Sequence, residues 1–266
     1  MGQIKPDLAD VHRLYGIARI LVVAFSLQAL SCGQKADLPR SSSVGEPEQS
    51  SPQPKSGIEE VSRVVERLHH GIDVSGFSGA VDWTQVAAEG HSFAFVKATE
   101  GMDLKDPAFD ANWPDMKKAG VIRGAYHFYV TEDDPKIQAQ FFIDNVALES
   151  GDLAPVVDIE VIGHDTKQGW QENLKAYLEI IEKRYGLKPI IYTSPNFWDE
   201  HFSAGYGEYP LWVAEYGVEA PRIPVGWSDW HLWQWQGDVQ VPGVEKSADL
   251  NRVNRTHANL SALVVP

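Results

Sequence analysis

The sequence predicts an α/β barrel of about eight strands in residues 58–266, with its last helices missing or reduced. Short apolar runs alternate there with helical patterns, which is typical of βα units around a parallel sheet. Several of the runs are fully apolar, as expected of strands that are buried on both faces. After Thr193 the helical signal fades, and strands follow one another through loops rich in Gly and Pro. We therefore expect a closed sheet that is irregular in its last third.

The strands are marked by seven apolar runs and by one further stretch near the end of the domain, 248–251. Each run is four to nine residues long and is bounded by polar or turn-forming residues, which is the usual pattern of a buried strand. The runs are His70–Val74, Phe93–Ala98, Val121–Tyr129, Ala154–Ile159, Pro189–Thr193, Leu211–Ala214 and His231–Trp235.

Two helices between these runs are clearly indicated. Asp106 followed by Pro107 predicts an N-cap with proline at the first helical position, and Gly120 ends that helix. Its apolar stripe is formed by Ala108, Phe109, Trp113 and Met116. In the second helix, which ends at Gly186, apolar residues recur at spacings of three and four, at Trp170, Leu174, Tyr177, Leu178 and Ile181.

Composition and charge exclude several classes of protein. Of the 266 residues, 43% are hydrophobic and 23% charged, which excludes wholesale disorder, a collagen-like repeat and a multi-span membrane protein. The formal net charge of -14 argues against binding of nucleic acid. Residues 1–57 contain six basic and five acidic residues, so 17 basic and 32 acidic residues remain in 58–266. The net negative charge of the chain therefore lies in residues 58–266.

The N-terminal 57 residues predict export. A basic start is followed by the apolar run Ile20–Leu30 and then by Cys32, the single cysteine. This resembles a bacterial lipobox, although Ala29 and Leu30 depart from the usual residues. We expect residues 1–32 to be a signal peptide of the lipoprotein type, with Cys32 lipidated and the protein anchored to a membrane of the cell envelope; otherwise it is secreted. Residues 33–57, rich in Ser, Pro, Gln and Glu, predict a disordered tether.

Carboxylates follow the predicted strands at positions where a barrel carries its chemistry. Asp73 ends the first run, Asp158 and Glu160 end the fourth, and Asp249 lies in the last stretch. Asp158 and Glu160 are two residues apart, so on a strand their side chains leave on the same face. Paired carboxyl groups are the usual equipment of glycoside hydrolysis, although a strand-end carboxylate is often only a solvated cap.

Aromatic residues at or near other strand ends suggest sugar binding, because flat rings stack on the apolar faces of pyranoses. Core packing is the alternative interpretation for each of them. The candidates are Tyr126, Tyr192, Trp212, Trp233 and Trp235.

Taken in order, these motifs resemble the lysozymes of glycoside hydrolase family 25 over residues 69–255. The resemblance implies an irregular TIM-like barrel of five βα units followed by three strands. It also implies cleavage of the β-1,4 bond between N-acetylmuramic acid and N-acetylglucosamine in peptidoglycan. The motifs are HGIDVS (70–75), VDW (81–83), FVKATEG (95–101), GAYHFY (124–129), PVVDIE (155–160), IYT (191–193), LWVA (211–214), LWQW (232–235) and ADLN (248–251).

The resemblance implies a role for each carboxylate. Glu160 would be the general acid, and Asp158 would orient the 2-acetamido group or stabilise positive charge on the sugar. Asp73 and Asp249 would complete an acidic floor, and Tyr126 would contact the sugar. Retention and inversion of configuration both stay open.

Three further polar residues within these motifs are expected to be structural. Lys97 and Glu100 are expected to form a structural pair, and His127 to be a packed barrel residue.

Several alternative functions stay open, and specific sequence features disfavour two others. A non-catalytic peptidoglycan-binding module, a chitinase, and a muramidase that prefers deacetylated glycan stay open. A serine hydrolase is disfavoured because Gly76-Phe77-Ser78-Gly79 lacks the Gly-x-Ser-x-Gly spacing. A zinc site is disfavoured because no His-Glu-x-x-His occurs. We expect no metal, no cofactor and no protein partner.

Overall fold

The computed structural model describes residues 70–163, 167–254 and 260–266. The predicted signal peptide, Cys32 and the tether lie outside the described residues. Within the described part, none of the helices has the length and apolar character needed to cross a membrane.

The described strands form one sheet that closes on itself. The strand order is β1-β9-β8-β7-β6-β5-β4-β2-β3, and a further β1–β2 pairing closes eight of the strands into a barrel. Each barrel strand from β1 through β2 and β4 to β8 is parallel to the next one in the chain. Strand β9 is antiparallel to both of its neighbours, β8 and β1. The strands are β1 (His70–Val74), β2 (Phe93–Glu100), β3 (Leu104–Lys105), β4 (Ile122–Phe128), β5 (Val156–Asp158), β6 (Ile190–Thr193), β7 (Leu211–Ala214), β8 (Leu232–Val239) and β9 (Ala248–Val253).

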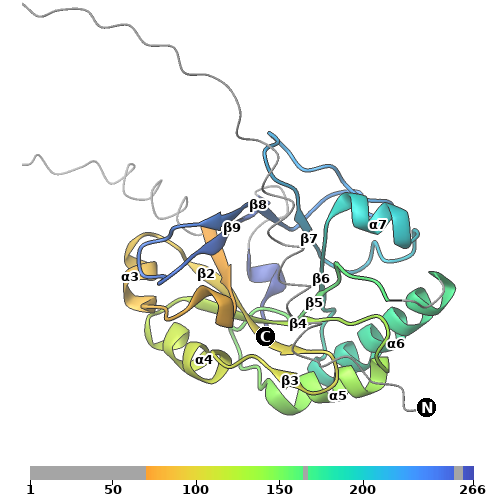
Figure 1. Ribbon diagram of the computed structural model, residues 1–266, viewed down its shortest axis with the longest axis horizontal. Coiled ribbons are helices and arrows are strands. Elements are labelled where there is room, and N and C mark those ends of the chain that lie inside the picture. The colour runs from red at the N-terminus through yellow and green to blue at the C-terminus, as the bar shows by residue number, and fades with distance from the viewer. Residues whose placement is uncertain (1–69, 164–166, 255–259) are drawn as a thin grey trace, which may run out of the picture. The chain divides into compact units, whose positions relative to one another are not determined.

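Five α-helices follow the first five barrel strands, and they lie around the outside of the sheet (Figure 1). No helix is present between β7 and β9 in the described residues. The predicted architecture of five βα units followed by three strands is therefore confirmed. The helices are α3 (Trp83–Ala88), α4 (Phe109–Lys118), α5 (Pro135–Asn145), α6 (Lys167–Tyr185) and α7 (Pro195–His201), with short 3-10 turns at Gly76–Ser78 and Leu260–Leu263.

The start of α4 differs from the prediction. The helix begins at Phe109, with Ala108 at the N-cap position, rather than directly after Asp106. The Asp106 carboxylate still accepts a hydrogen bond from the Ala108 amide at 2.9 Å, but its other oxygen accepts from the amide of Gly76 at 2.9 Å. Asp106 thus ties the loop after β1 to the start of α4, a long-range contact that helix-start rules do not consider.

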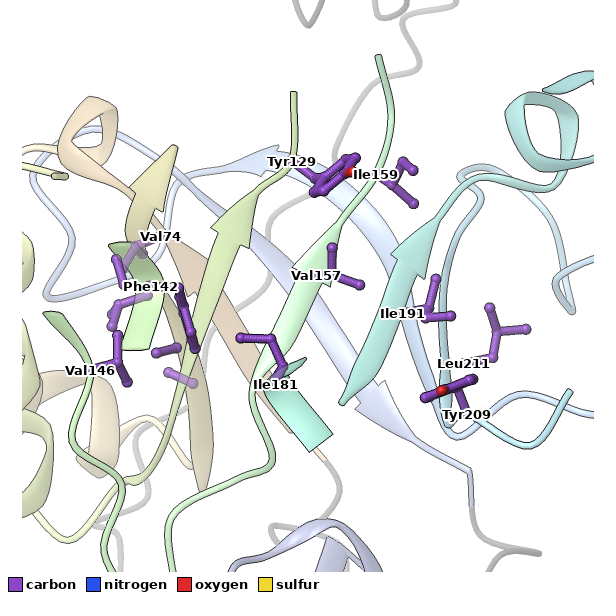
Figure 2. Close-up of a cluster of buried hydrophobic side chains, with 14 of the residues drawn as sticks. Val74, Tyr129, Phe142, Val146, Val157, Ile159, Ile181, Ile191, Tyr209 and Leu211 are labelled. Carbon is purple, nitrogen blue, oxygen red and sulfur yellow. The ribbon is translucent and has the colours of Figure 1, made fainter. Parts of the chain in front are cut away.

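Two hydrophobic clusters occupy the two faces of the sheet. The outer cluster lies between strands and helices, and Figure 2 shows Val157 of β5 and Ile191 of β6 in it, with Ile181 of α6. The inner cluster fills the barrel with residues that alternate with the outer ones, including Phe95, Val156 and Leu232. This alternation decides which polar side chains of each strand face the interior.

The amino end of the barrel is closed by the C-terminal segment. Leu260 and Leu263 belong to the inner cluster, and Ala154 donates a backbone hydrogen bond to Leu263 at 2.7 Å. Nearby, Arg123 of β4 donates to both carboxylate oxygens of Asp152, at 2.7 and 3.0 Å. This end of the barrel is therefore packed and ion-paired, which leaves the carboxyl ends of the strands for function.

Candidate active site

Strand alternation brings the predicted interior residues together at the carboxyl ends of the strands. On β5, Val156 faces the inner cluster and Val157 the outer one, so Asp158 faces inward. On β1, Ile72 and Val74 face outward, so Asp73 faces inward. Asp73 lies directly opposite Asp249 in the β1–β9 register.

The Asp158–Glu160 pair is placed by β5 and by one hydrogen bond beyond it. Ile159 donates its amide to the Tyr192 carbonyl at 3.0 Å, which keeps the chain extended past the end of the strand. The alternation therefore brings Glu160 to the same side as Asp158. Asp158 is buried, at 3% exposure, whereas Glu160 is partly exposed. One carboxyl group thus lies inside the barrel and the other lies nearer to solvent.

Asp73 and Asp249 are held by amide donors. The Asp73 Oδ2 atom accepts from Gln234 Nε2 at 2.7 Å and from Asn251 Nδ2 at 2.8 Å. Asp249 accepts from Gln234 Nε2 at 3.2 Å and from the backbone amide of Asp238 at 2.7 Å. Hydrogen bonds of this kind orient the carboxylate oxygens.

The Asp238 contact depends on an irregularity in β8. The β8–β9 register shifts between Gln236 and Val239, and Asp238 has a φ of 58°. It is the only non-glycine residue with positive φ in the described ranges. Bulges redirect backbone groups, and here the redirected amide bonds Asp249. The local strain therefore occurs where a candidate catalytic carboxylate is oriented.

The predicted aromatic residues divide into inward and outward groups. Tyr126, Tyr192 and Trp212 face inward and are almost fully buried in the inner cluster. The ring of Trp212 stacks on Phe95 and its Nε1 atom donates to Asn251 Oδ1 at 2.9 Å. Tyr192 and Trp212 thus contact the amides that bind the carboxylates, and the small exposed area of all three residues leaves little ring surface for stacking on a sugar.

Trp233 and Trp235 are not brought to the carboxylates. They alternate with Leu232 and Gln234 on β8, and Trp233 lies in the outer cluster with Trp235 packed against it. The guanidinium of Arg252 lies 3.7 Å from the centre of the Trp233 ring. These contacts assign both indoles to the outer layer, so we leave them out of the site proposed below.

The three polar residues expected to be structural have structural partners. Lys97 Nζ lies 2.5 Å from Glu100 Oε2, so the expected pair is formed. His127 faces outward, stacks on Tyr177 and contacts Gln138 and Thr99 through its two ring nitrogens. Burial lowers the pKa of His127 to about 3, so the ring is neutral. A neutral, helix-facing ring does not serve as a base in the barrel interior.

No group of three or more His, Cys, Asp or Glu side chains suited to a metal ion occurs in the described part of the chain.

Two amide residues of the site were missed by the sequence analysis. Gln234 and Asn251 occur within the LWQW and ADLN motifs, and both are buried against Asp73. The signal was the period of two: Asn251 shares the face of Asp249, and Gln234 that of Leu232. The period of two does not show which face of the strand is interior, so the sequence analysis predicted the tryptophans of LWQW, and not its glutamine, as residues of the site.

Comparisons with known proteins agree with this geometry. A family model described as Glycosyl hydrolases family 25 matches residues 72–244. Lysozyme M1 of Streptomyces globisporus is 36% identical over 211 residues, covering 73% of this chain and 70% of that protein. The protein YegX of Escherichia coli strain K12 is 36% identical over 200 residues, covering 73% of each.

A solved structure extends the agreement to the fold. The crystal structure of the bacterial lysozyme from Streptomyces coelicolor superimposes with a TM-score of 0.68 at 32% identity, covering 73% of this chain and 94% of that one. The chain therefore belongs to family 25 of the glycosyl hydrolases, the lysozyme family, and is a glycoside hydrolase.

Proposed function

We propose that this protein hydrolyses peptidoglycan by cleaving the β-1,4 bond between N-acetylmuramic acid and N-acetylglucosamine. The observation that carries the proposal is the arrangement of carboxylates in a family 25 barrel. Asp73 and Asp158 face the interior at the carboxyl ends of β1 and β5, Asp249 lies beside Asp73 at the amino end of the antiparallel β9, and Glu160 follows Asp158. Four carboxyl groups at one rim suit a reaction with a positively charged transition state.

Glu160 acts as the general acid in this proposal. A proton donor has to reach the glycosidic oxygen of a glycan that binds from solvent, and Glu160 is the partly exposed member of its pair. The buried Asp158 then serves as the fixed negative group that orients the acetamido group or stabilises charge on the sugar. Exposure therefore separates the two roles.

Asp73 and Asp249 form the acidic floor. The hydrogen bonds described above come from amides, which orient a carboxylate without adding a positive charge. A fixed negative charge stabilises an oxocarbenium-like sugar at no cost of reorganisation during the reaction. Tyr126 faces the same interior and is only 3% exposed, so the sugar contact proposed for it is an edge or hydroxyl contact and not stacking on the ring face.

The test is a digestion of purified peptidoglycan followed by borohydride reduction and mass spectrometry of the new ends. We expect new muramitol ends with the wild type, and at least about a hundredfold fewer with Glu160→Gln. Glu89→Gln is the matched control, since Glu89 is exposed where α3 leads to the amino end of β2. That control should retain wild-type activity.

The other outcomes identify the alternatives. New glucosaminitol ends would show that the neighbouring bond is cleaved. Cleavage of chitin oligomers at an equal rate would make chitin the substrate class. Absence of new ends from folded protein that still sediments with peptidoglycan would replace the enzyme with a binding module.

A preference for deacetylated glycan is supported by charge near the carboxyl ends of β2 and β4. Burial raises the pKa of Asp133, and the neighbouring carboxylates of Asp103 and Glu132 raise it further. Such a concentration of negative charge attracts the ammonium group of a deacetylated glucosamine. Parallel digestion of acetylated and deacetylated walls should show a higher kcat/KM on the latter, and Asp133→Asn should reduce the ratio.

Export with a lipid anchor at Cys32 completes the proposal. It rests on the basic start, the apolar run and the cysteine that follows it. Growth of an expressing bacterium with a radiolabelled fatty acid should label the wild-type protein, and Cys32→Ser should abolish the label. Equal labelling of both proteins, or of neither, would contradict the anchor and favour simple secretion.

A further inference from the structure

Gln234 is a completely buried amide that contacts both floor carboxylates. Its Nε2 atom donates to Asp73 Oδ2 at 2.7 Å and to Asp249 Oδ2 at 3.2 Å. Its Oε1 atom accepts from the hydroxyl groups of Tyr192 at 2.8 Å and of Tyr216 at 2.5 Å. A primary amide has two hydrogens and two lone pairs to offer, so all four hydrogen-bonding positions of Gln234 are used.

The four contacts determine the direction of the amide. Turned over, the side chain would present its oxygen to two carboxylates and its NH₂ group to the tyrosine hydroxyls. A carboxylate accepts hydrogen bonds and does not donate them, so both contacts with Asp73 and Asp249 would become repulsive. The two carboxylates therefore fix the direction in which Gln234 donates, and the two tyrosine hydroxyls complete the arrangement by donating to its oxygen.

Two carboxyl groups on adjacent strands tend to share one proton, because both cannot ionise freely at close range. Asp73 and Asp249 lie opposite each other in the β1–β9 register. Gln234 supplies one hydrogen to each of them and so bridges the two carboxyl groups with donors of its own. Each carboxylate has a second amide donor, Asn251 for Asp73 and the Asp238 backbone for Asp249.

We infer that Gln234 is a positioning residue that keeps Asp73 and Asp249 as two separate, oriented hydrogen-bond acceptors. This inference rests on the proposed function of the same site and assigns the residue on which the acidic floor depends. Gln234 acts through the two carboxylates. Its burial separates it from an incoming glycan, so its loss should affect kcat rather than KM.

Tyr216 offers an accessible way to disturb Gln234. It lies in the loop after β7, and its side chain is 40% exposed. Its ring lies close to Gly237, where an added Cβ would be 3.2 Å from the ring and hydroxyl atoms. Replacement of Tyr216 by Phe removes the hydroxyl hydrogen bond to Gln234 and keeps the ring, so the barrel core is unchanged.

The main test replaces Gln234 by Glu, which has nearly the same shape but lacks the NH₂ donors. The titratable groups that contact this position are Asp73 of β1, Asp249 of β9, Tyr192 of β6 and Tyr216. A third carboxyl group there can donate only when it carries a proton, and it repels both aspartates when ionised.

We expect kcat of Gln234→Glu on purified peptidoglycan to fall about 10- to 100-fold at neutral pH and to recover partly at acidic pH, with KM nearly unchanged. Gln234→Met should lower kcat without recovery in acid. Tyr216→Phe should lower kcat a few-fold with KM unchanged. The matched control is Gln85→Glu, the same substitution at an exposed position of α3, and it should behave as wild type.

Two outcomes would overturn the inference: an equal loss of activity by Gln234→Glu at every pH, or a Tyr216→Phe variant that raises KM and leaves kcat unchanged. The first would make Gln234 a packing residue, and the second would make Tyr216 a substrate contact. An inactive wild type would instead overturn the proposed function. Thermal unfolding then still tests the geometry, because Gln234→Glu should gain stability relative to wild type as the pH falls.

Discussion

The two ends of this barrel hold buried carboxylates in different ways. At the amino end, Asp152 is bound by the guanidinium of Arg123, which donates two hydrogen bonds at 2.7 and 3.0 Å. At the carboxyl end, Asp73 receives hydrogen bonds from the side-chain amides of Gln234 and Asn251 at 2.7 and 2.8 Å. Both carboxylates are about 5% exposed, so burial does not distinguish them.

The nature of the donor explains the difference. An arginine neutralises the carboxylate it binds, which suits a position that only has to be stable. An amide satisfies the oxygen and leaves its charge, which remains available to stabilise a cationic sugar. The same residue type is therefore structural at one end of the barrel and functional at the other, and its hydrogen-bond donors decide which.

Removal of the cation at the amino end should have the largest effect on stability. Arg123→Met leaves Asp152 buried without its guanidinium, which should lower the free energy of unfolding by about 3–5 kcal/mol. Urea unfolding measures this change, and the activity of the folded fraction should be unaffected. The double variant Arg123→Met with Asp152→Asn should regain part of the loss. A cost below about 1 kcal/mol would show that the pair behaves as an exposed one.

Neutralisation of the carboxylate at the other end should have the opposite pattern. Asp73→Asn keeps the shape but removes a negative charge opposite Asp249, so the activity on peptidoglycan should fall at least about a hundredfold. The free energy of unfolding should stay the same or rise, because repulsion between the two carboxylates is relieved. Release of reducing ends and urea unfolding measure both quantities. Loss of stability with retained activity would reverse the assignment of the two ends.

His127 is a third kind of buried polar group, one that remains neutral. Its folded pKa is lowered by burial from 6.5 to about 3, so between these values the unfolded chain binds a proton that the folded chain does not. Stability should therefore fall as the pH drops through this window, by at most about 1.4 kcal/mol per pH unit.

The measurement that isolates His127 is the difference between wild type and His127→Gln in thermal or urea unfolding from pH 7 to pH 3. The carboxylates contribute equally to both proteins, so the shallower slope expected for the variant reports the histidine alone. Parallel curves would mean that His127 gains its proton in the folded state as easily as in the unfolded one.

The smallest effect is expected at the strained residue of the bulge. Alanine at Asp238 has to adopt the same positive φ, whereas glycine does so without penalty. Asp238→Ala should therefore be less stable than Asp238→Gly by about 1 kcal/mol. Both variants lose the side-chain contact with Ser247, so the difference isolates the backbone. Asp238→Gly should retain activity because its amide still reaches Asp249; equal stability of the two would show that the bulge relaxes.

The sequence predicted the fold well where the pattern is local. Runs such as His70–Val74 and Leu211–Ala214 became strands with the predicted limits, because a strand buried on both faces is mostly apolar along its length. The limits failed where a distant contact intervened. Asp106 was predicted to cap α4 directly, but it also binds the loop after β1, and the helix begins at Phe109.

The carboxylates of the candidate site could be predicted from the sequence. The residues that donate hydrogen bonds to them could not. Asp73, Asp158 and Asp249 could be found because acidic residues at the ends of apolar runs are conspicuous. Gln234 could not, because its importance depends on contacts with four side chains from other strands and loops. The outward position of Trp233 could not be predicted either, since a period of two separates the two faces of a strand but does not show which one faces the barrel interior.

By itself, then, the sequence determined that a closed α/β barrel forms and that its functional rim is acidic. Both follow from properties that neighbouring residues share: apolar runs that must be buried, and carboxylates at their ends. Only the tertiary structure decided which face of each strand lies inside, and which donors hold each carboxylate. Those depend on barrel closure, which brings β1, β8 and β9 together across more than 150 residues of chain to form contacts such as Gln234 with Asp73.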